Sequence, residues 1–306
     1  MKYYLAIDIG GTKTAIGVYD ESGAEKYHGR IVTEPNDGCA QLIERLFRMT
    51  QDVLKEYAVV AGGIACPGPL DVESGTVNNT TTLGWVNVPI VQMFSEKFKL
   101  PFTLINDCNA GAYGEYKMRN CRNMVYISIS TGIGGGIIAD GKLYNGQGNA
   151  AEFGHLHVRG GKRLKCGCGR EDCLELYASG TAVESEYYRL MGKTLSGVDI
   201  ADLANIGDPV AVAIYNEVAE YIAEAVVDIQ KVLDPETIVI GGGVADAIPF
   251  RKNPSFQKLG QYGVNVKFSN LNGRQVLLGT MYYIRDSGVF LGKGESYERH
   301  QEILRQ

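Results

Sequence analysis

The chain has 306 residues, of which 45% are hydrophobic, and chains of this length can bury a large core and commonly divide into two domains. Its 35 acidic side chains outnumber the 30 basic ones, and no long basic run occurs, so nucleic acid is not expected as a partner. No segment approaches the roughly 18 apolar residues of a membrane span, and the start lacks a signal-peptide layout. We therefore expect a cytoplasmic protein with no membrane contact, whose cysteines are metal ligands or core residues rather than disulfides.

The first part of the chain predicts a hairpin followed by alternating helices and strands. Apolar residues at strand or helix spacing, interrupted by glycine turns, carry this prediction. The predicted elements are, in chain order, strand 4–8, glycine turn 10–12, strand 15–19, helix 41–57, strands 59–65 and 103–105, and a helix that begins near residues 106–107.

The second part opens with the same pattern of strand, glycine turn and strand. Its predicted elements are strand 124–130, turn 131–136, strand 137–139, turn 140–141, helix 209–233, strand 237–240, the glycine run 241–243, and a strand and helix within 275–284. The repetition indicates a two-lobed α/β fold with ligands at the carboxyl ends of strands. We expect lobes at 1–115 and 116–306, and allow the C-terminal helix to pack back on the first lobe.

Three glycine turns stand at predicted strand ends, at 10–12, 134–136 and 241–243. Glycine lets backbone amides approach phosphate oxygens closely, so each turn is a candidate phosphate or nucleotide contact. Each turn taken alone is more often just a tight hairpin. Their recurrence in a duplicated framework favours the phosphate interpretation.

Two carboxylates are candidates for chemistry. Asp8 precedes the first glycine turn, where a negative charge beside phosphate suggests a Mg²⁺ ion between them, and the alternative is a hairpin cap. Asp107 follows a strand and precedes a helix, where it could act as the general base on an attacking hydroxyl. A helix N-cap is an equally good interpretation of Asp107.

One histidine and three cysteines have the composition of a structural zinc site: His155, Cys166, Cys168 and Cys173. Three thiolates and an imidazole fill a tetrahedron and leave no open position for chemistry. A disulfide or buried cysteines that only fill space are the alternatives, but one residue between Cys166 and Cys168 is too short for an easy disulfide. The zinc interpretation is therefore favoured.

Taken together, the ordered motifs resemble the ROK family of sugar kinases and sugar-responsive repressors, which have the actin and hexokinase fold with a duplicated βββαβαβα core. The resemblance covers nearly the whole chain. It is carried by the two phosphate motifs 8–13 and 131–136, the adenosine motif 241–243, the catalytic segment 106–110, and the zinc and sugar motif 152–155 with 166–169.

The resemblance implies ATP-dependent phosphorylation of the 6-hydroxyl of a hexose or N-acylhexosamine, with Mg²⁺, structural zinc and a homodimer. Asp107 would be the catalytic base, and His155 would bind zinc through one ring nitrogen and sugar through the other. Sugar contacts are implied for Gly68, Asn106, Asp107, Glu152, His155 and Glu175. Contacts with the nucleotide and its metal are implied for Asp8, Gly10, Gly11, Thr12, Lys13, Thr131, Gly132, Gly241, Gly242 and Gly243.

Two departures from the family's glucokinases bear on the sugar. Thr81 stands where these glucokinases usually have Asn, and Ala151 stands where they usually have Gly. An alanine at the second position resembles the sequence of N-acetylmannosamine kinases. Glucose and N-acetylmannosamine are the favoured substrates, with fructose, allose or β-glucosides as alternatives. A non-catalytic sugar-sensing regulator of the family is the alternative of another class, disfavoured because no DNA-binding segment is expected before Asp8.

Overall fold

The computed structural model describes residues 2–34, 38–80 and 82–288. The chain forms two compact units, one containing the first 118 residues and the helix after residue 274, the other residues 119–273. Each unit is described by itself. Within the described ranges, no helix has the length and apolar character needed to cross a bilayer.

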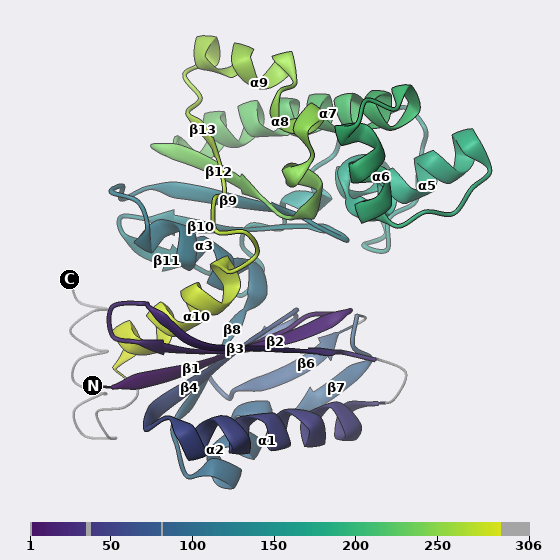
Figure 1. The fold of residues 1–306 in the computed structure, drawn as a ribbon. Helices are drawn as coiled ribbons and strands as arrows, with labels where there is room; N and C mark the ends of the chain where they lie inside the picture. The colour runs from purple at the N-terminus through teal and green to yellow at the C-terminus, as the bar shows by residue number, and fades with distance from the viewer. Residues whose placement is uncertain (1, 35–37, 81, 289–306) are drawn as a thin grey trace. The chain divides into compact units, whose positions relative to one another are not determined.

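The first unit is built on a five-stranded mixed sheet in the order β3-β2-β1-β4-β8 (Figure 1). The predicted hairpin is confirmed, since β1 and β2 pair antiparallel with Asp8 opposite Ala15. The parallel strands β4 and β8 then extend the sheet beside β1. The strands are β1 (Tyr3–Ile9), β2 (Lys13–Asp20), β3 (Glu25–Val32), β4 (Val59–Cys66) and β8 (Phe102–Asn106).

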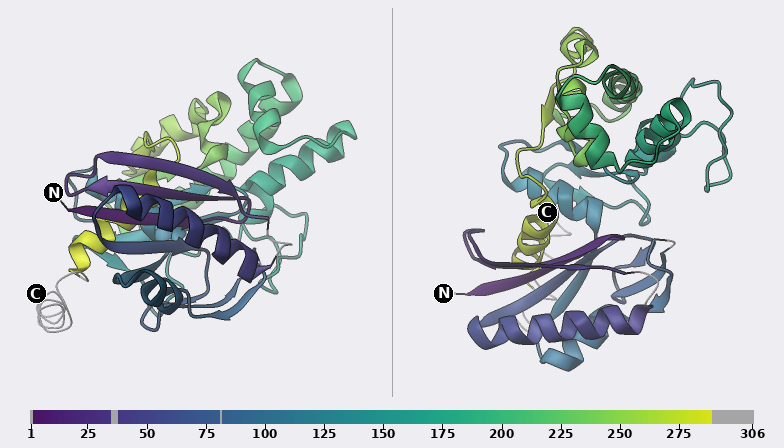
Figure 2. Two further views of the ribbon diagram at one scale, coloured as in Figure 1. Left: turned by 60° about the horizontal axis from the view of Figure 1, so that its bottom comes forward. Right: turned by 45° about the vertical axis from the view of Figure 1, so that its right-hand side comes forward.

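Helices cover both faces of this sheet. Figures 1 and 2 show α1 (Cys39–Glu56) and α2 (Ile90–Phe98) on one face, and α10 (Gln275–Ser287) on the other, where it packs against α3 (Asp107–Lys117). The helix predicted over 41–57 is thus confirmed as α1, whose buried residues include Leu42, Ile43 and Leu46. A small antiparallel sheet lies in the same unit and consists of β5 (Leu70–Asp71), β6 (Thr76–Thr80) and β7 (Trp85–Val88).

Helices α3 and α10 touch backbone to backbone. A Cβ added to Gly279 would lie 1.7 Å from the carbonyl oxygen of Ala110, so no side chain fits at this position. Asp286 of α10 also pairs with Lys117 at 2.7 Å and accepts a hydrogen bond from Tyr113 Oη at 2.8 Å. The prediction of a strand within 275–284 is wrong, because the buried apolar residues there follow helical spacing over the whole span.

The second unit repeats the topology of the first. Its sheet has the order β11-β10-β9-β12-β13, again an antiparallel hairpin extended by parallel strands. The strands are β9 (Met124–Ile129), β10 (Ile133–Ala139), β11 (Lys142–Tyr144), β12 (Thr237–Gly241) and β13 (Val266–Phe268). The predicted α/β class with a duplicated core is confirmed.

The turn predicted over 131–136 is shorter than expected. Strand β10 begins at Ile133, so Gly134, Gly135 and Gly136 are strand residues rather than a hairpin turn. A Cβ on Gly135 would lie 2.4 Å from the ring of Phe153 and 2.6 Å from the carbonyl oxygen of Tyr126. Close packing against this strand, and not a turn, therefore explains the central glycine of the run.

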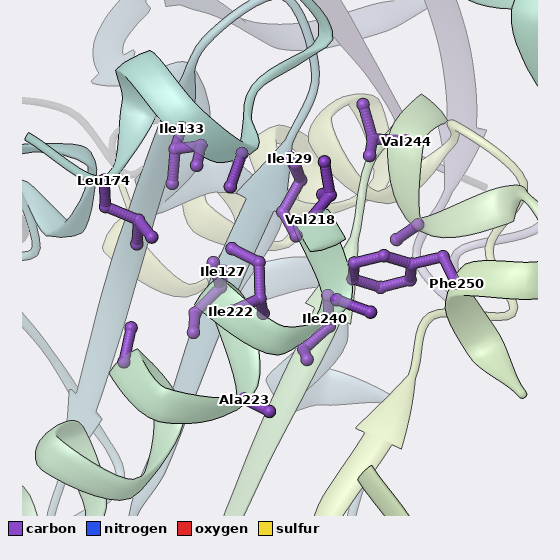
Figure 3. Packing of buried hydrophobic residues seen from close by; sticks show 14 of the residues in the cluster. Ile127, Ile129, Ile133, Leu174, Val218, Ile222, Ala223, Ile240, Val244 and Phe250 are labelled. Carbon is purple, nitrogen blue, oxygen red and sulfur yellow. The ribbon is translucent and has the colours of Figure 1, made fainter. Parts of the chain in front are cut away.

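The long helix α7 (Pro209–Leu233) matches its predicted span and forms much of the second core (Figure 3). Asp208 caps it by accepting hydrogen bonds from two backbone amides of the first turn, and proline occupies the first turn itself. Val218 and Ile222 of α7 pack near Ile127 and Ile240 of the sheet. The remaining helices of the unit are η2 (Phe153–His155), α4 (Glu175–Ala178), α5 (Gly180–Met191), α6 (Gly197–Asn205), η3 (Gly243–Asp246), α8 (Ile248–Arg251), α9 (Pro254–Lys258) and η4 (Leu259–Tyr262).

Candidate active site

The junction between β8 and α3 separates the roles of Asn106 and Asp107. Asn106 is the helix cap, because its side-chain oxygen accepts hydrogen bonds from the amides of Cys108 and Asn109 at 3.0 and 3.1 Å. The cap interpretation of Asp107 is therefore wrong. Asp107 is the first residue of α3, and its Oδ1 accepts a hydrogen bond from the Cys108 amide at 2.8 Å. The cap uses the amide oxygen of Asn106, so this side chain has its NH₂ group to offer a ligand.

Asp8 and Asp107 belong to the same edge of the first sheet. Asp8 pairs with Ala65, and Ala65 with Ile105, so the carboxyl ends of three adjacent parallel strands meet here. Both side chains are half-buried, yet protein surrounds their carboxylates closely enough that burial is the main cause of their pKa shifts.

The negative charge of Asp107 disfavours ionisation of Asp8. Burial, and then the negative charge of Asp107, raise the pKa of Asp8 to about 7, while Arg30 opposes this shift. Burial also raises the pKa of Asp107, against hydrogen bonds from Cys108 that lower it. A buried pair of this kind favours a divalent cation or a proton nearby.

The first glycine loop is held by a residue that the sequence motifs did not reveal. Thr33, which is fully buried, donates its hydroxyl to the Gly10 carbonyl at 2.6 Å and its amide to the Thr12 carbonyl at 3.0 Å. The Gly10 amide in turn donates to the Lys13 carbonyl at 3.1 Å. Thr12 and Lys13 are exposed, whereas Thr33 follows the far strand β3 and lies outside the motif, so spacing gave no signal for it.

Gly68 lies beside the junction between β8 and α3. A Cβ built on Gly68 would lie 3.7 Å from Nδ2 of Asn106, and the preceding strand pairs Cys66 with Asn106. The structure therefore brings Gly68 to the NH₂ group that Asn106 has to offer. Thr81, one of the two departures from the family's glucokinases, is outside the described residues.

In the second unit, the turn after β9 packs directly on Glu175. The Ile133 amide donates to Glu175 Oε2 at 2.8 Å, and a Cβ on Gly132 would lie 2.4 Å from the same oxygen. Gly132 thus makes room for the carboxylate. The start of α5 is bonded to the same turn, since the hydroxyl of Thr181 donates to the Thr131 carbonyl at 2.9 Å.

The histidine and three cysteines converge on one point. Their ligand atoms all lie within 4.8 Å of one another: Nδ1 of His155 and Sγ of Cys166, Cys168 and Cys173. The Sγ atoms of Cys168 and Cys173 are 3.6 Å apart, close to the ~3.8 Å expected across a tetrahedron with Zn–S bonds of about 2.3 Å. All three cysteines are free thiols, so the disulfide alternative is wrong. The geometry is consistent with a zinc site.

The two ring nitrogens of His155 face different partners. Nδ1 lies 3.5 Å from Sγ of Cys166, whereas Nε2 lies 3.9 Å from Oε2 of Glu152. Residue Glu152 precedes the short η2 helix that carries the histidine. One nitrogen is thus directed to the cysteine cluster and the other to a carboxylate, and the predicted contact of the second nitrogen with sugar stays a prediction.

The third glycine run follows β12. Gly241 ends the strand, and Gly242 has a positive φ of 95° with its Cα packed on the backbone of Ile129. A Cβ on Gly243 would meet no atom within 4 Å, so this residue borders open space at the strand end.

Comparison with known proteins gives the family. The ROK family model matches residues 4–270. The chain belongs to the ROK family. It is 33% identical to a glucokinase of Streptomyces coelicolor over 79% of this chain and 82% of that protein. It is 34% identical to an N-acetylmannosamine kinase of Yersinia pestis over 92% of this chain and 98% of that protein.

Solved ROK structures share the fold. A ROK family glucokinase from Streptomyces griseus, in complex with glucose and AMPPNP, superposes with a TM-score of 0.81 at 30% identity, over 92% of this chain and 99% of that one. The predicted resemblance to ROK sugar kinases is confirmed, and the chain is a sugar kinase homologous to glucokinases and N-acetylmannosamine kinases.

In this ROK chain the predicted site residues form groups within each unit. The first unit brings together Asp8, Gly68, Asn106 and Asp107. The second unit joins Thr131, Gly132 and Glu175 in one group, and Glu152 with the histidine and cysteine cluster in another.

Proposed function

We propose that this protein is an ATP-dependent kinase that phosphorylates the 6-hydroxyl of a hexose or N-acylhexosamine, with glucose or N-acetylmannosamine as substrate. The observation that carries the proposal is Asp107, a half-buried carboxylate at the carboxyl end of β8 that is not used as the helix cap. It is supported by relatives named glucokinase and N-acetylmannosamine kinase and by the AMPPNP and glucose of the S. griseus complex.

Asp107 acts as the general base. Its carboxylate accepts the proton of the sugar 6-hydroxyl as that oxygen attacks the γ-phosphorus, and ADP leaves in line. The raised pKa of Asp107 makes it a stronger base than an exposed aspartate, and a cation close by would favour its ionised form.

Recognition of the sugar is assigned to five groups with polar atoms, namely Gly68, Asn106, Glu152, His155 and Glu175. Each has a hydrogen-bonding group suited to a sugar hydroxyl. A sugar that lacks the matching hydroxyl leaves a buried partner unpaired, which is the source of discrimination.

The nucleotide is assigned to the glycine segments and Asp8. Backbone amides of residues 10–13, 131–132 and 241–243 suit phosphate and adenosine contacts. The residues present fit Mg²⁺, because the buried charge of Asp8 lies next to a second carboxylate, an arrangement that a divalent cation stabilises. Magnesium supplies charge neutralisation on the phosphates when it is bound.

Zinc is assigned to His155, Cys166, Cys168 and Cys173. The metal would supply a rigid closed centre that holds the loop carrying His155, whose other ring nitrogen is assigned to sugar. We further propose that the protein is cytoplasmic and forms a homodimer. Sedimentation of the purified protein tests the homodimer directly.

A coupled assay with ATP and Mg²⁺ over glucose, N-acetylmannosamine, fructose and allose tests the function. We expect turnover with the highest kcat/KM on glucose or N-acetylmannosamine. Tight binding of a sugar without phosphate transfer to any member of the panel would contradict the proposal.

A further inference from the structure

A buried hydrogen bond spans the segment that carries both a metal ligand and Glu175. The hydroxyl of Tyr177 donates to Oδ1 of Asp172 at 2.5 Å, and the Leu164 amide donates to the same oxygen at 2.9 Å. Only 7% of Asp172 is exposed. Cys173 and Glu175 lie between the two bonded residues, so the hydrogen bond closes a short loop around them.

Tyr177 is fixed from its other sides as well. Its oxygen accepts the Lys162 amide at 3.2 Å, and its ring packs on Tyr221 of α7 with the ring centres 5.0 Å apart. The backbone passes so close that a Cβ on Gly160 would lie 2.2 Å from the ring. The tyrosine is therefore held in one orientation while its hydroxyl holds Asp172.

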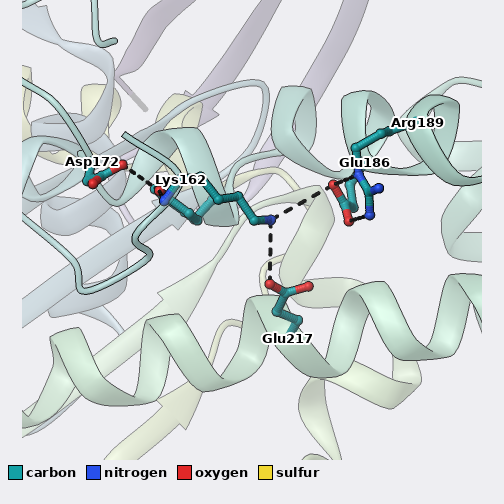
Figure 4. Close-up of polar contacts among 6 residues, drawn as sticks. Lys162, Asp172, Glu186, Arg189 and Glu217 are labelled. Carbon is teal, nitrogen blue, oxygen red and sulfur yellow. Dashed lines mark hydrogen bonds and ion pairs between the residues drawn. The ribbon is translucent and has the colours of Figure 1, made fainter. Parts of the chain in front are cut away.

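Lys162 connects this arrangement to two long helices. Its Nζ lies 5.5 Å from the centre of the Tyr177 ring and forms ion pairs with Glu186 of α5 and Glu217 of α7, at 3.9 and 3.7 Å (Figure 4). Arg189 is paired with Glu186 in turn. These partly exposed pairs add little stability by themselves, but they orient the segment that carries the Lys162 amide.

Helix α4 depends on such bonds for its position. It spans only Glu175–Ala178, a single turn, and one turn of helix is not stable alone. A cavity of about 220 Å³ borders it, lined among others by Leu164, Leu176 and Tyr177. Side chains do not fill the space on the cavity side of α4. Hydrogen bonds therefore contribute more to the orientation of this helix.

We propose that the Tyr177–Asp172 hydrogen bond positions Glu175 for sugar, as a partner to the Ile133 amide that bonds the Glu175 carboxylate at 2.8 Å. The bond ties α4 to the segment 155–173, which carries His155 and the three cysteines and is called the metal-binding loop below, so that Glu175 keeps its place relative to these residues. This inference rests on the proposed function, in which Glu175 binds a sugar hydroxyl. Tyr177 and Asp172 are positioning residues and do not touch the reacting atoms.

Steady-state kinetics of Tyr177→Phe test the proposal. The variant keeps the ring and its packing but removes the hydroxyl donor. We expect the KM for the sugar to rise about tenfold, as for loss of a partner that orients a binding group, with the KM for ATP unchanged. Tyr221→Phe is the matched control, because it removes a hydroxyl from the neighbouring ring and keeps the bond to Asp172, and it should leave both constants unchanged.

Asp172→Asn is the conservative second variant. Asp172 has a positive φ of 54°, which Asn tolerates well, and the Asn side-chain oxygen can still accept the Tyr177 hydroxyl. We expect this variant to keep a sugar KM near that of the wild type. It also keeps the test decisive if Tyr177→Phe fails to fold, since a sugar KM raised about tenfold in folded Asp172→Asn would contradict the hydrogen-bond account.

Two further measurements separate the possible failures. If Tyr177→Phe lowers only Tm and leaves the sugar KM unchanged, the bond is merely structural and the inference is overturned. It is also overturned if the variant loses zinc, measured by metal analysis, in proportion to its lost sugar affinity. Glu175→Gln tests the underlying assignment: an unchanged sugar KM in that variant would remove the proposed role of Glu175 itself.

Discussion

At the scale of single residues, the candidate site of the first unit contains two carboxylates, Asp8 and Asp107, that the sheet register brings to one edge. Neither Asp8 nor Asp107 has a sequence neighbourhood that predicts its pKa. The raised values arise because β1, β4 and β8 run parallel and end together, so two acidic groups distant in sequence share one protein-enclosed region.

Asp8 should make the metal-free protein less stable as the pH rises. In the unfolded chain Asp8 ionises near its ordinary pKa of 3.8, whereas in the folded protein it keeps its proton until about pH 7. Between these values the folded state binds more protons, so the free energy of unfolding falls with rising pH. Asp8→Asn cannot lose a proton at this position. Its free energy of unfolding should therefore fall less than that of the wild type between acidic pH and pH 8.

Urea denaturation across pH 4–8 without added Mg²⁺ measures this difference. Adding Mg²⁺ at pH 8 should then stabilise the wild type more than Asp8→Asn. Wild-type and variant curves that run parallel over the whole range would show that Asp8 keeps an ordinary pKa in the folded protein.

At the scale of elements, long periodic segments could be predicted from the sequence and close backbone contacts could not. Helix α7 begins at a capping Asp and a Pro and matches its prediction from end to end. Gly134–Gly136 were predicted as a turn and lie in strand β10. Gly135 packs against the ring of Phe153, a residue distant in the sequence that only the fold brings next to it.

The contact between α3 and α10 should not tolerate a side chain. In Gly279→Ala the new Cβ would lie 1.7 Å from the Ala110 carbonyl oxygen, a backbone atom that cannot rotate away. We expect the free energy of unfolding to fall by about 1–3 kcal/mol or more, since 1–3 kcal/mol is the usual cost of overpacking. Gly260→Ala is the control, since its Cβ would meet no atom within 4 Å. Equal stabilities of the two variants in urea would refute this packing.

The metal-binding loop should couple stability to sugar affinity. Cys168→Ser removes one ligand, so we expect reduced zinc content, lower Tm and a sugar KM raised about tenfold, because the loop no longer holds His155. Cys121→Ser removes a cysteine outside the cluster and should change none of these. If Tm falls in Cys168→Ser and the sugar KM does not move, zinc only stabilises the fold.

At the scale of the whole molecule, duplication was the most informative property of the sequence. The repeated strand, glycine turn and strand predicted two similar sheets, and both have the same strand order. The candidate site residues could be named from the ordered motifs. Their supporting contacts could not, because Thr33, Asp172 and Tyr177 are ordinary residue types whose partners are set only by folding.

The central claim is that Asp107 is the base of a sugar kinase, and single-turnover phosphoryl transfer by Asp107→Asn tests it most directly. We predict that the rate falls about 10²- to 10⁴-fold, the usual contribution of a general base, while calorimetry finds sugar binding retained. Asp52→Asn, at an exposed carboxylate of α1, should transfer phosphate at the wild-type rate. Retention of the wild-type transfer rate by Asp107→Asn would contradict the account.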